Sequence, residues 1–360
     1  MPPKSSGSPR FSVTVICSPN LWINQTSYIY AGLFGLQEQG VITLDFKEAG
    51  ATDHNLVFIE ARDLQTSQSR KICFDIHDKA YLFNVSALET HDYCFKRSYY
   101  LPDLAELPAH LQNRVVPWGP VFAARFRSSR IPGLLLSSFG NRPYFKIPGK
   151  TWKNKFTTLY VFWNLATPKT FESPPTTARE LAVFFQTRLW TDGEVTGTPT
   201  ASEVNAERVA LIKALKEAFK DRFRGGVVPT DFTRKHYPEY LVEGSTRRGD
   251  YLRKMHQCLV GVDANGLHNC VAWKLGEYLA GSLCIVAKPI RDLLPVPLTE
   301  SNALTFYDPE TCVSACDRLF SNPALAAKMR EENYRYYQEF AQPSSNIWNC
   351  LQHAFRQGNG

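Results

Sequence analysis

The sequence predicts an α/β protein with two Rossmann-like domains, and three observations indicate this class. The chain opens with a β-branched run at residues 11–17, a turn, and a helical pattern over residues 25–39 that stops at Gly40. Residues 258–289 show the same alternation, with a buried strand on each side of a helix, which is the unit of parallel sheets. The length of 360 residues is too great for a typical single core and suits two domains.

The N-terminal half continues the alternation. Apolar runs up to residue 60 are typical of two further strands, and the next apolar run leads into Asp75, His77 and Asp78. We expect these three side chains at the carboxyl end of a strand, the edge that faces the ligand crevice in open α/β sheets. One of them is a candidate general base for an acceptor hydroxyl, and a loop-capping cluster is the alternative. The two aspartates are three positions apart, so they do not form a D-x-D metal motif, which favours metal-independent chemistry.

Three later segments are informative. Residues 92–100 combine two cations with four aromatic residues, which fits a phosphate or sugar-stacking site or an exposed basic strand end. Residues 128–155 are basic, rich in Pro and Gly and without periodicity, so we expect irregular surface that faces an acceptor or a membrane. Residues 167–177 contain three prolines and are the best candidate for a linker.

The second domain is expected to begin with a strand at residues 180–185, closely followed by Arg188. Thr200 and Glu203 match a capping box for a helix that runs to Phe219. The predicted domain limits are a disordered tail at 1–10, an N-terminal domain at 11–170, a C-terminal domain at 178–340, and a segment at 341–360 whose helix crosses back to the N-terminal domain.

The helix predicted at residues 269–280 has two distinct faces. One is an apolar stripe that should lie on the sheet, and the other joins Lys274 and Glu277 to the small residues Cys270 and Gly281. On the functional interpretation, the helix N-terminus and Lys274 hold a diphosphate while Glu277 accepts hydrogen bonds from ribose hydroxyls. The alternative is an ordinary solvated ion pair three residues apart.

The order of signals in this region resembles the donor-binding half of GT-B glycosyltransferases. A polar turn, a K-x-x-E helix, a hydrophobic strand that ends in Pro, and an N-x-L-x-F-x-D-P-E segment follow one another. The K-x-x-E spacing is similar to exostosin-like and fucosyltransferase-like members, and the tail is similar to bacterial group 1 members. The resemblance covers the last hundred residues well, the middle loosely and the first half hardly at all. The residues of the last motif are Asn302, Leu304, Phe306, Asp308, Pro309 and Glu310.

The resemblance implies a GT-B fold, in which two Rossmann-like domains face each other across a cleft. It also implies that Arg188, after Lys274, holds the donor diphosphate, and that Gly266, His268 and Asn269 belong to the donor-binding turn. A capping or merely polar role is the alternative for His268. Asn269 stands where retaining members often have the first of two glutamates, so inversion is slightly favoured.

Composition restricts the partners. Hydrophobic residues make up 44% and charged residues 21%, as in ordinary globular proteins, and no apolar run approaches the ~18 residues of a membrane span. The first ten residues lack the apolar core of a secretory signal. The net charge of +7 suits an anionic donor, a peripheral contact with an anionic membrane, or a plain solvated surface. Without a Lys/Arg block or an aromatic platform motif, we expect no nucleic-acid partner.

The nine cysteines include no C-x-x-C pair, so we expect no zinc site and a reducing, cytoplasmic location. The resemblance to GT-B glycosyltransferases implies an enzyme that moves a sugar from a nucleoside-diphosphate sugar to a hydroxyl of a glycan or lipid-linked glycan, and we expect no metal or other cofactor. A non-catalytic glycan- or nucleotide-binding protein and a nucleotide-sugar epimerase of the same fold are the alternatives.

Overall fold

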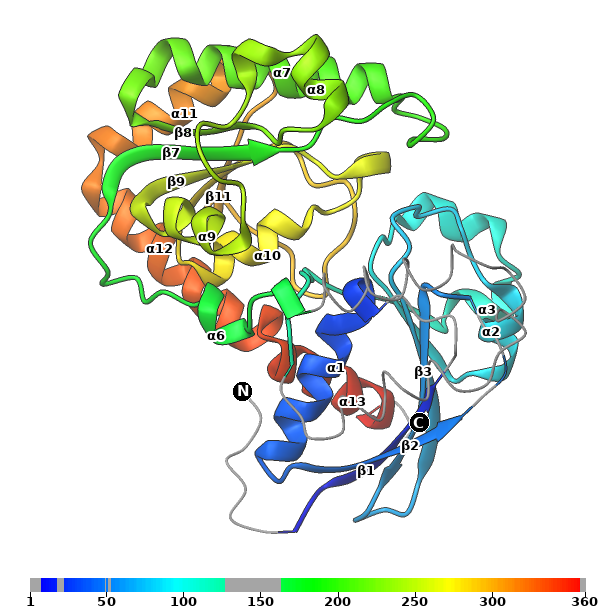
Figure 1. Ribbon diagram of the computed structural model, residues 1–360. Helices are drawn as coiled ribbons and strands as arrows, with labels where there is room; N and C mark the ends of the chain where they lie inside the picture. Colours follow the sequence, from blue (N-terminus) through cyan, green and yellow to red (C-terminus); the bar gives the residue numbers. More distant parts are fainter. Residues whose placement is uncertain (1–7, 18–22, 49, 51–52, 127–162, 357–360) are drawn as a thin grey trace. The chain divides into compact units, whose positions relative to one another are not determined.

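The computed structural model describes residues 8–17, 23–48, 50, 53–126 and 163–356, and the chain forms two compact units (Figure 1). Unit 1 comprises Met1–Pro168, Leu293–Pro295 and Gln338–Gly360. Unit 2 comprises Lys169–Asp292 and Val296–Tyr337. The residues predicted as irregular surface, 128–155, and most of the predicted tail lie outside the described residues.

Unit 1 contains a six-stranded sheet in the order β2-β1-β3-β4-β5-β6. Only β3 among these strands runs antiparallel to its neighbours, so the other five share one direction. Their carboxyl ends therefore lie along one edge of the sheet. The strands are β1 (Phe11–Cys17), β2 (Ile42–Glu48), β3 (Leu56–Asp63), β4 (Ser69–Asp75), β5 (Tyr93–Lys96) and β6 (Val115–Pro117).

Helices cover both faces of this sheet. The Phe11 ring on β1 contacts Trp348 and Phe355 of the C-terminal helix α13. Helix α13 packs closely on α1 at Gly32, where a Cβ would lie only 2.5 Å from Pro343 O. The other face is covered by short helices whose leucines pack on Cys73 and Cys94. The helices are α1 (Ile23–Glu38), α2 (Val85–Thr90), the 3-10 turn Leu101–Glu106, α3 (Ala109–Gln112) and α13 (Pro343–Arg356).

Unit 2 contains a five-stranded sheet in the order β11-β10-β9-β7-β8, and every pairing in it is parallel. The chain moves from β7 outward to β8 and then returns to the other side of β7, so the order reverses between β7 and β9. The predicted α/β class, with a Rossmann-like sheet in each of two domains, is confirmed. The strands are β7 (Glu180–Thr187), β8 (Phe223–Val227), β9 (Cys258–Asp263), β10 (Cys284–Ala287) and β11 (Ala303–Thr305).

The two faces of this sheet have different coverings. Val183 and Phe185 of β7 belong to a core with Leu211 and Ile212 of α7 and with α11, whereas Phe184 contacts the rings of α9 and α10. Figure 1 shows α7 and α11 on one side of β7 and α9 and α10 on the other. The helices are α6 (Pro168–Phe171), α7 (Ala201–Phe219), α8 (Asp231–His236), α9 (Arg248–Gln257), α10 (Trp273–Ala280), α11 (Pro309–Ser321) and α12 (Pro323–Tyr336). The 3-10 turns are Lys220–Arg222, Pro238–Tyr240 and Leu267–Asn269, and a π-helical turn spans Tyr337–Ala341.

Local sequence signals worked well for α7 and poorly for α10. The capping box of Thr200 and Glu203 is present and begins α7 as predicted. The prediction that the central helix starts near Asn269 is wrong, because His268 and Asn269 have φ values of 59° and 60° and α10 begins at Trp273. Left-handed residues cannot continue a right-handed helix, so they form a turn before it.

The cations of residues 92–100 are buried. Lys96 and Arg97 are 1% and 7% exposed, so the interpretation of residues 92–100 as an exposed basic strand end is wrong. No helix in the described part of the chain combines the length and the apolar character that crossing a bilayer requires.

Candidate functional site

The reversal point of the unit 2 sheet brings polar side chains together. In doubly wound sheets, ligands bind outside the carboxyl ends of the strands on either side of this point. Phe184 of β7 lies opposite Gly261 of β9, and Gln186 and Asp263 lie two residues further along these strands. Both side chains therefore point to the face covered by α9 and α10. Within the described structure, Gln186 Oε1 and Asp263 Oδ1 are buried and accept no hydrogen bond.

Arg208 connects the two strand ends. This α7 residue is 6% exposed and donates hydrogen bonds from Nη1 to Arg188 O at 2.7 Å and from Nη2 to Asn265 O at 3.3 Å. Burial lowers the pKa of Arg208 to about 10. The guanidinium group therefore stays charged at neutral pH and fixes the loops that follow β7 and β9.

Lys274 and Asp263 are electrostatically coupled to Arg208. Burial, assisted by the Arg208 charge, lowers the pKa of Lys274 to about 8. Burial raises the pKa of Asp263 to about 7, although Lys274 and Arg208 act in the opposite direction. Among the ion pairs of the described residues, none joins Asp263 to either cation. The reversal point thus holds two enclosed cations and a carboxylate that is costly to ionise.

Glu277 has partners other than Lys274. It is 3% exposed, and it accepts hydrogen bonds from Arg248 Nη2 and Tyr251 OH, each at 2.5 Å. Burial would lower the pKa of Arg248, but the Glu277 carboxylate keeps it above the usual value. Both carboxylate oxygens are thus engaged by α9. The alternative interpretation, a solvated ion pair of Lys274 with Glu277, does not describe this arrangement.

The turn before α10 contains the other predicted donor-binding residues. The Gly266 N–H donates to Cys270 O at 2.8 Å, and a Cβ on Gly266 would lie 2.7 Å from Cys270 Sγ, so a larger residue would require the Cys270 side chain to move. His268 is buried and Asn269 is exposed. Ala272 is the N-cap of α10 and offers no side-chain cap. The N-terminus of α10 and its partial positive charge therefore lie beside Lys274.

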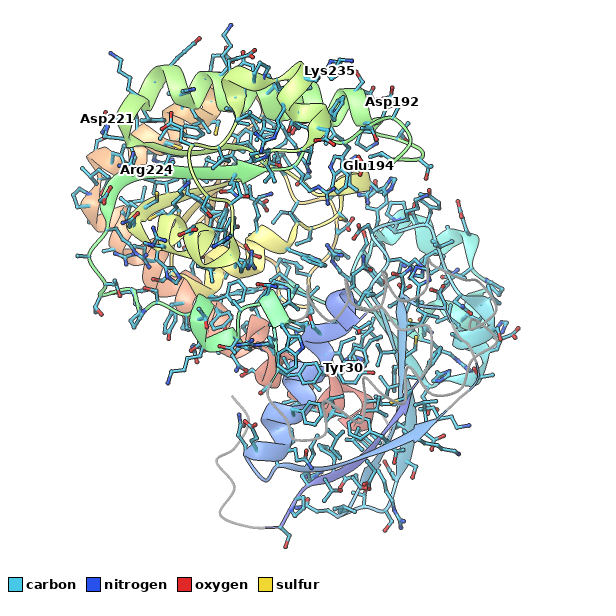
Figure 2. All side chains as sticks on the ribbon, viewed as in Figure 1. Tyr30, Asp192, Glu194, Asp221, Arg224 and Lys235 are labelled. Carbon is cyan, nitrogen blue, oxygen red and sulfur yellow. The ribbon has the colours of Figure 1, made fainter. Side chains whose placement is uncertain are left out.

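Arg188 lies at the carboxyl end of β7 but is exposed. Its guanidinium group pairs with Glu194 at 3.6 Å and lies 4.5 Å from the centroid of the Trp190 ring. Figure 2 shows Glu194 and Asp192 together on the loop beyond β7. The side chain is 52% exposed, so it can move toward a ligand at low cost.

The carboxyl edge of unit 1 holds a connected set of ion pairs. The Asp75 carboxylate accepts from Lys96 Nζ at 2.9 Å and contacts His77 Nδ1 at 2.7 Å, and Asp53 Oδ2 lies 3.3 Å from His77 Nε2. Burial would raise the pKa of Asp75, but Lys96 and His77 lower it. Burial would lower the pKa of His77, but its two carboxylate neighbours raise it. The imidazole is therefore oriented by Asp75 and made more basic.

The other two base candidates have structural contacts. Asp75 also caps the loop, because one of its oxygens accepts from the His77 N–H at 2.9 Å, as the capping alternative expected. Asp78 accepts from Arg97 Nη1 at 2.5 Å. Of the three candidates, His77 has the chemistry of a general base with a carboxylate that orients it.

The residues behind the sequence resemblance have structural roles. The Asn302 amide donates to Asn333 Oδ1 at 3.2 Å inside unit 2, and Asp308 caps α11 through Thr311. Glu310 is exposed in the first turn of that helix.

Sequence reasoning missed Asp263, Arg208 and Asp53, and it placed Lys96 in a candidate phosphate or sugar-stacking segment without identifying Asp75 as its partner. Asp263 carried a local signal, since it ends an otherwise apolar strand. The roles of Arg208, Asp53 and Lys96 are recognisable only after folding, because their partners are far away in the sequence. Within the described residues, no group of three or more His, Cys, Asp or Glu side chains is arranged to hold a metal ion.

No protein-family model matches the chain, and no curated protein matches its sequence. Among similar solved structures, HepE of Anabaena in complex with UDP has 10% identity and a TM-score of 0.38, with 93% of this chain and 96% of that one covered. A glycosyltransferase of Rickettsia africae has 11% identity and a TM-score of 0.38, with 76% and 67% covered. The C-terminal domain of a glycosyl transferase group 1 family protein of Francisella tularensis has 10% identity and a TM-score of 0.34, with 48% and 95% covered. Group 1 glycosyltransferases are thus among the structures similar to this chain.

Proposed function

We propose that the protein is a glycosyltransferase that moves a sugar from a nucleoside-diphosphate sugar to a hydroxyl of a glycan or lipid-linked glycan. The observation that carries this proposal is the pair of cations at the reversal point of the unit 2 sheet, the buried Arg208 and the half-buried Lys274. No ion pair of the described residues joins either cation to a carboxylate, so both can stabilise an anion, and this edge of the sheet is where such folds bind nucleotides.

The leaving diphosphate explains the chemistry of this edge. Its negative charge grows as the bond to the sugar breaks, so cations fixed nearby stabilise the transition state more than the ground state. Lys274 and the N-terminus of α10 supply fixed positive charge, and the exposed Arg188 can close over the diphosphate. Arg208 holds the two loops in place.

The recognition of hydroxyl groups needs acceptors that other residues have not filled. Each Glu277 oxygen accepts one hydrogen bond from α9 and can accept another, so in this proposal Glu277 fixes α10 beside Lys274 and is also a candidate acceptor for the ribose hydroxyls. Asp263 and Gln186 each keep an acceptor oxygen without a bond, and they are further candidates for the ribose or sugar hydroxyls.

His77 is the proposed general base. The Asp75 carboxylate lies against Nδ1, and Nε2, which lies 3.3 Å from Asp53 Oδ2, is the nitrogen that receives the proton of the acceptor hydroxyl when this hydroxyl takes the place of Asp53. Because the Asp75 carboxylate accepts a hydrogen bond, the neutral His77 ring is assigned the tautomer that carries its proton on Nδ1. In this scheme unit 1 binds the acceptor, the reaction needs no metal and inverts the anomeric centre, and the enzyme works in the cytoplasm without nucleic acid, with peripheral membrane contact for a lipid-linked acceptor.

A thermal-shift screen against nucleoside diphosphates and their sugars tests the proposal. A ligand at about one hundred times its Kd stabilises the native state by about 2.7 kcal/mol, so nucleotides with the correct nucleobase should give the largest rise in Tm. The matched control is Lys235→Met, at an exposed residue on α8, beside Lys274→Met. If no nucleotide raises the Tm of the wild type, the transferase proposal fails.

Product analysis separates the alternatives. With the donor that the screen identifies, a transferase forms a new glycosidic bond only when an acceptor is present. An epimerase would change the sugar without an acceptor, and a binding protein would leave donor and acceptor unchanged.

A further inference from the structure

A cavity of about 620 Å³ lies beside β8, the edge strand of the unit 2 sheet. Its walls come from the end of α7, the first residues of β8, the segment 240–243 and α9. Arg224, which lines it, pairs at 3.3 Å with Glu180, the first residue of β7. Figure 2 shows Arg224 and Asp221 at the opposite end of the unit 2 sheet from Glu194. The cavity is therefore at the amino edge, away from the Lys274 site.

The lining carries an excess of positive charge. Lys216, Lys220, Arg224 and Lys254 contribute four cations, against the carboxylates of Asp221 and Glu243. Lys216 Nζ donates to Glu239 O at 3.1 Å and Lys254 Nζ donates to Glu243 O at 2.7 Å. Backbone carbonyls carry no net charge, so these hydrogen bonds orient the ammonium groups without neutralising them. The cavity therefore attracts an anion.

The rest of the lining suits a ligand larger than a bare ion. Phe223 and Tyr240 are half-buried rings, and Gly225 and Gly226 also line the cavity. These glycines are required by packing, because a Cβ on Gly226 would lie 2.6 Å from Tyr240 O. Rings, ammonium donors and two carboxylate acceptors together match a sugar ring and its hydroxyls. The volume is in the range of small-molecule sites, roughly 300–1,000 Å³.

We propose that this cavity is a second ligand site, which binds a sugar that carries a phosphate or sulfate ester. The ester lies among Lys216, Lys220 and Lys254, and the sugar ring lies against Tyr240 and Phe223. The site is independent of the Lys274 site, so it stands or falls separately from the proposed transferase activity.

Lysine footprinting on the whole protein tests this proposal residue by residue. The protein is acylated with an amine-reactive reagent in the presence of glucose 6-phosphate, glucose 6-sulfate or glucose, and modified lysines are quantified by mass spectrometry. A lysine covered by a ligand is labelled less by a factor of 1 + [L]/Kd, about tenfold at nine times the Kd. We expect both esters to protect Lys216, Lys220 and Lys254 and to leave Lys235 unchanged.

Two variants locate the effect. Lys216→Gln with Lys254→Gln should abolish protection of Lys220, whereas Lys274→Met should leave all three lysines protected. The proposal is overturned if neither ester protects these lysines at millimolar concentration, if Lys235 is protected equally, or if uncharged glucose protects as well as its esters. Protection of Lys216 that persists in the Lys274→Met protein separates this site from any phosphate bound at the carboxyl edge.

Discussion

The carboxyl edges of the two sheets use charge in opposite ways. In unit 1, Lys96, Asp75, His77 and Asp53 form a continuous chain of contacts between 2.7 and 3.3 Å. In unit 2, Asp263 is buried and Lys274 is half-buried, yet no ion pair of the described structure joins them. Paired charges hold a geometry, whereas enclosed charges without a pair are stabilised when a ligand arrives. We infer that the paired charges of unit 1 position a general base and that the unpaired charges of unit 2 bind an anion.

The largest expected effect is on turnover, at His77. His77→Gln keeps a polar side chain of similar length but cannot take a proton at neutral pH. General-base catalysis contributes typically about 10²–10⁴-fold, so kcat should fall by about that factor. Donor affinity measured by titration should not change, because the proposed donor site is in unit 2. Unchanged kcat in His77→Gln would show that His77 is not the general base.

The second effect is on the free energy of unfolding, which should respond differently to the same Lys→Met substitution at Lys96 and at Lys274. Lys96→Met leaves the buried Asp75 without its ammonium partner, which should cost roughly 3 kcal/mol, the lower end for a broken buried pair, because His77 remains. Lys274→Met removes a charge that burial already destabilises, so stability should stay equal or rise. Urea denaturation of both variants measures the difference. Equal losses in both proteins would contradict the contrast between the two edges.

The third effect is on donor binding. Loss of one charge-assisted hydrogen bond costs about 1.5–3 kcal/mol, so Lys274→Met should weaken nucleoside-diphosphate binding by roughly ten- to a hundredfold. Lys235→Met, at an exposed lysine of the same unit, should bind with wild-type affinity. Titration calorimetry gives both values, and equal affinities would place the diphosphate elsewhere.

The smallest effect is a displacement of the pH profile by Asp53→Asn. His77 acts as a base only when neutral, and the carboxylates of Asp75 and Asp53 raise its pKa above the usual 6.5. Removing the Asp53 charge lowers that pKa, so the acid limb of kcat should move to lower pH. The variant should then be faster than the wild type on that limb. A limb that stays fixed or moves to higher pH would show that another group titrates.

Signals that reside in one segment of chain were readable before the structure. The α/β class, the capping box of Thr200 and the two strands around the central helix all depend on residues close in sequence. The turn before α10 was misjudged because nothing in the local pattern announces left-handed φ at His268 and Asn269. The antiparallel direction of β3 was also not predicted, since hydrophobic patterns do not encode strand direction.

The residues proposed for the site were recognised in part for the same reason. Lys274 was singled out by its spacing from Glu277 on one helix face, and Asp75 and His77 were singled out because they follow a recognisable strand. The partners that decide their chemistry are distant, as Arg208 on α7 and Arg248 on α9 show. Glu277 illustrates the consequence, because its spacing from Lys274 indicated a shared ligand, whereas its contacts with Arg248 and Tyr251 of α9 could not be predicted.

Proton uptake on donor binding tests the central claim about Lys274 most directly. With a pKa of about 8, Lys274 is about half protonated at pH 8, and an adjacent diphosphate favours the charged form. Calorimetric titration of a nucleoside diphosphate in two buffers of different ionisation enthalpy counts the protons. The account predicts an uptake of about half a proton at pH 8 in the wild type and a much smaller uptake in Lys274→Met. Binding with equal uptake in both proteins would contradict it.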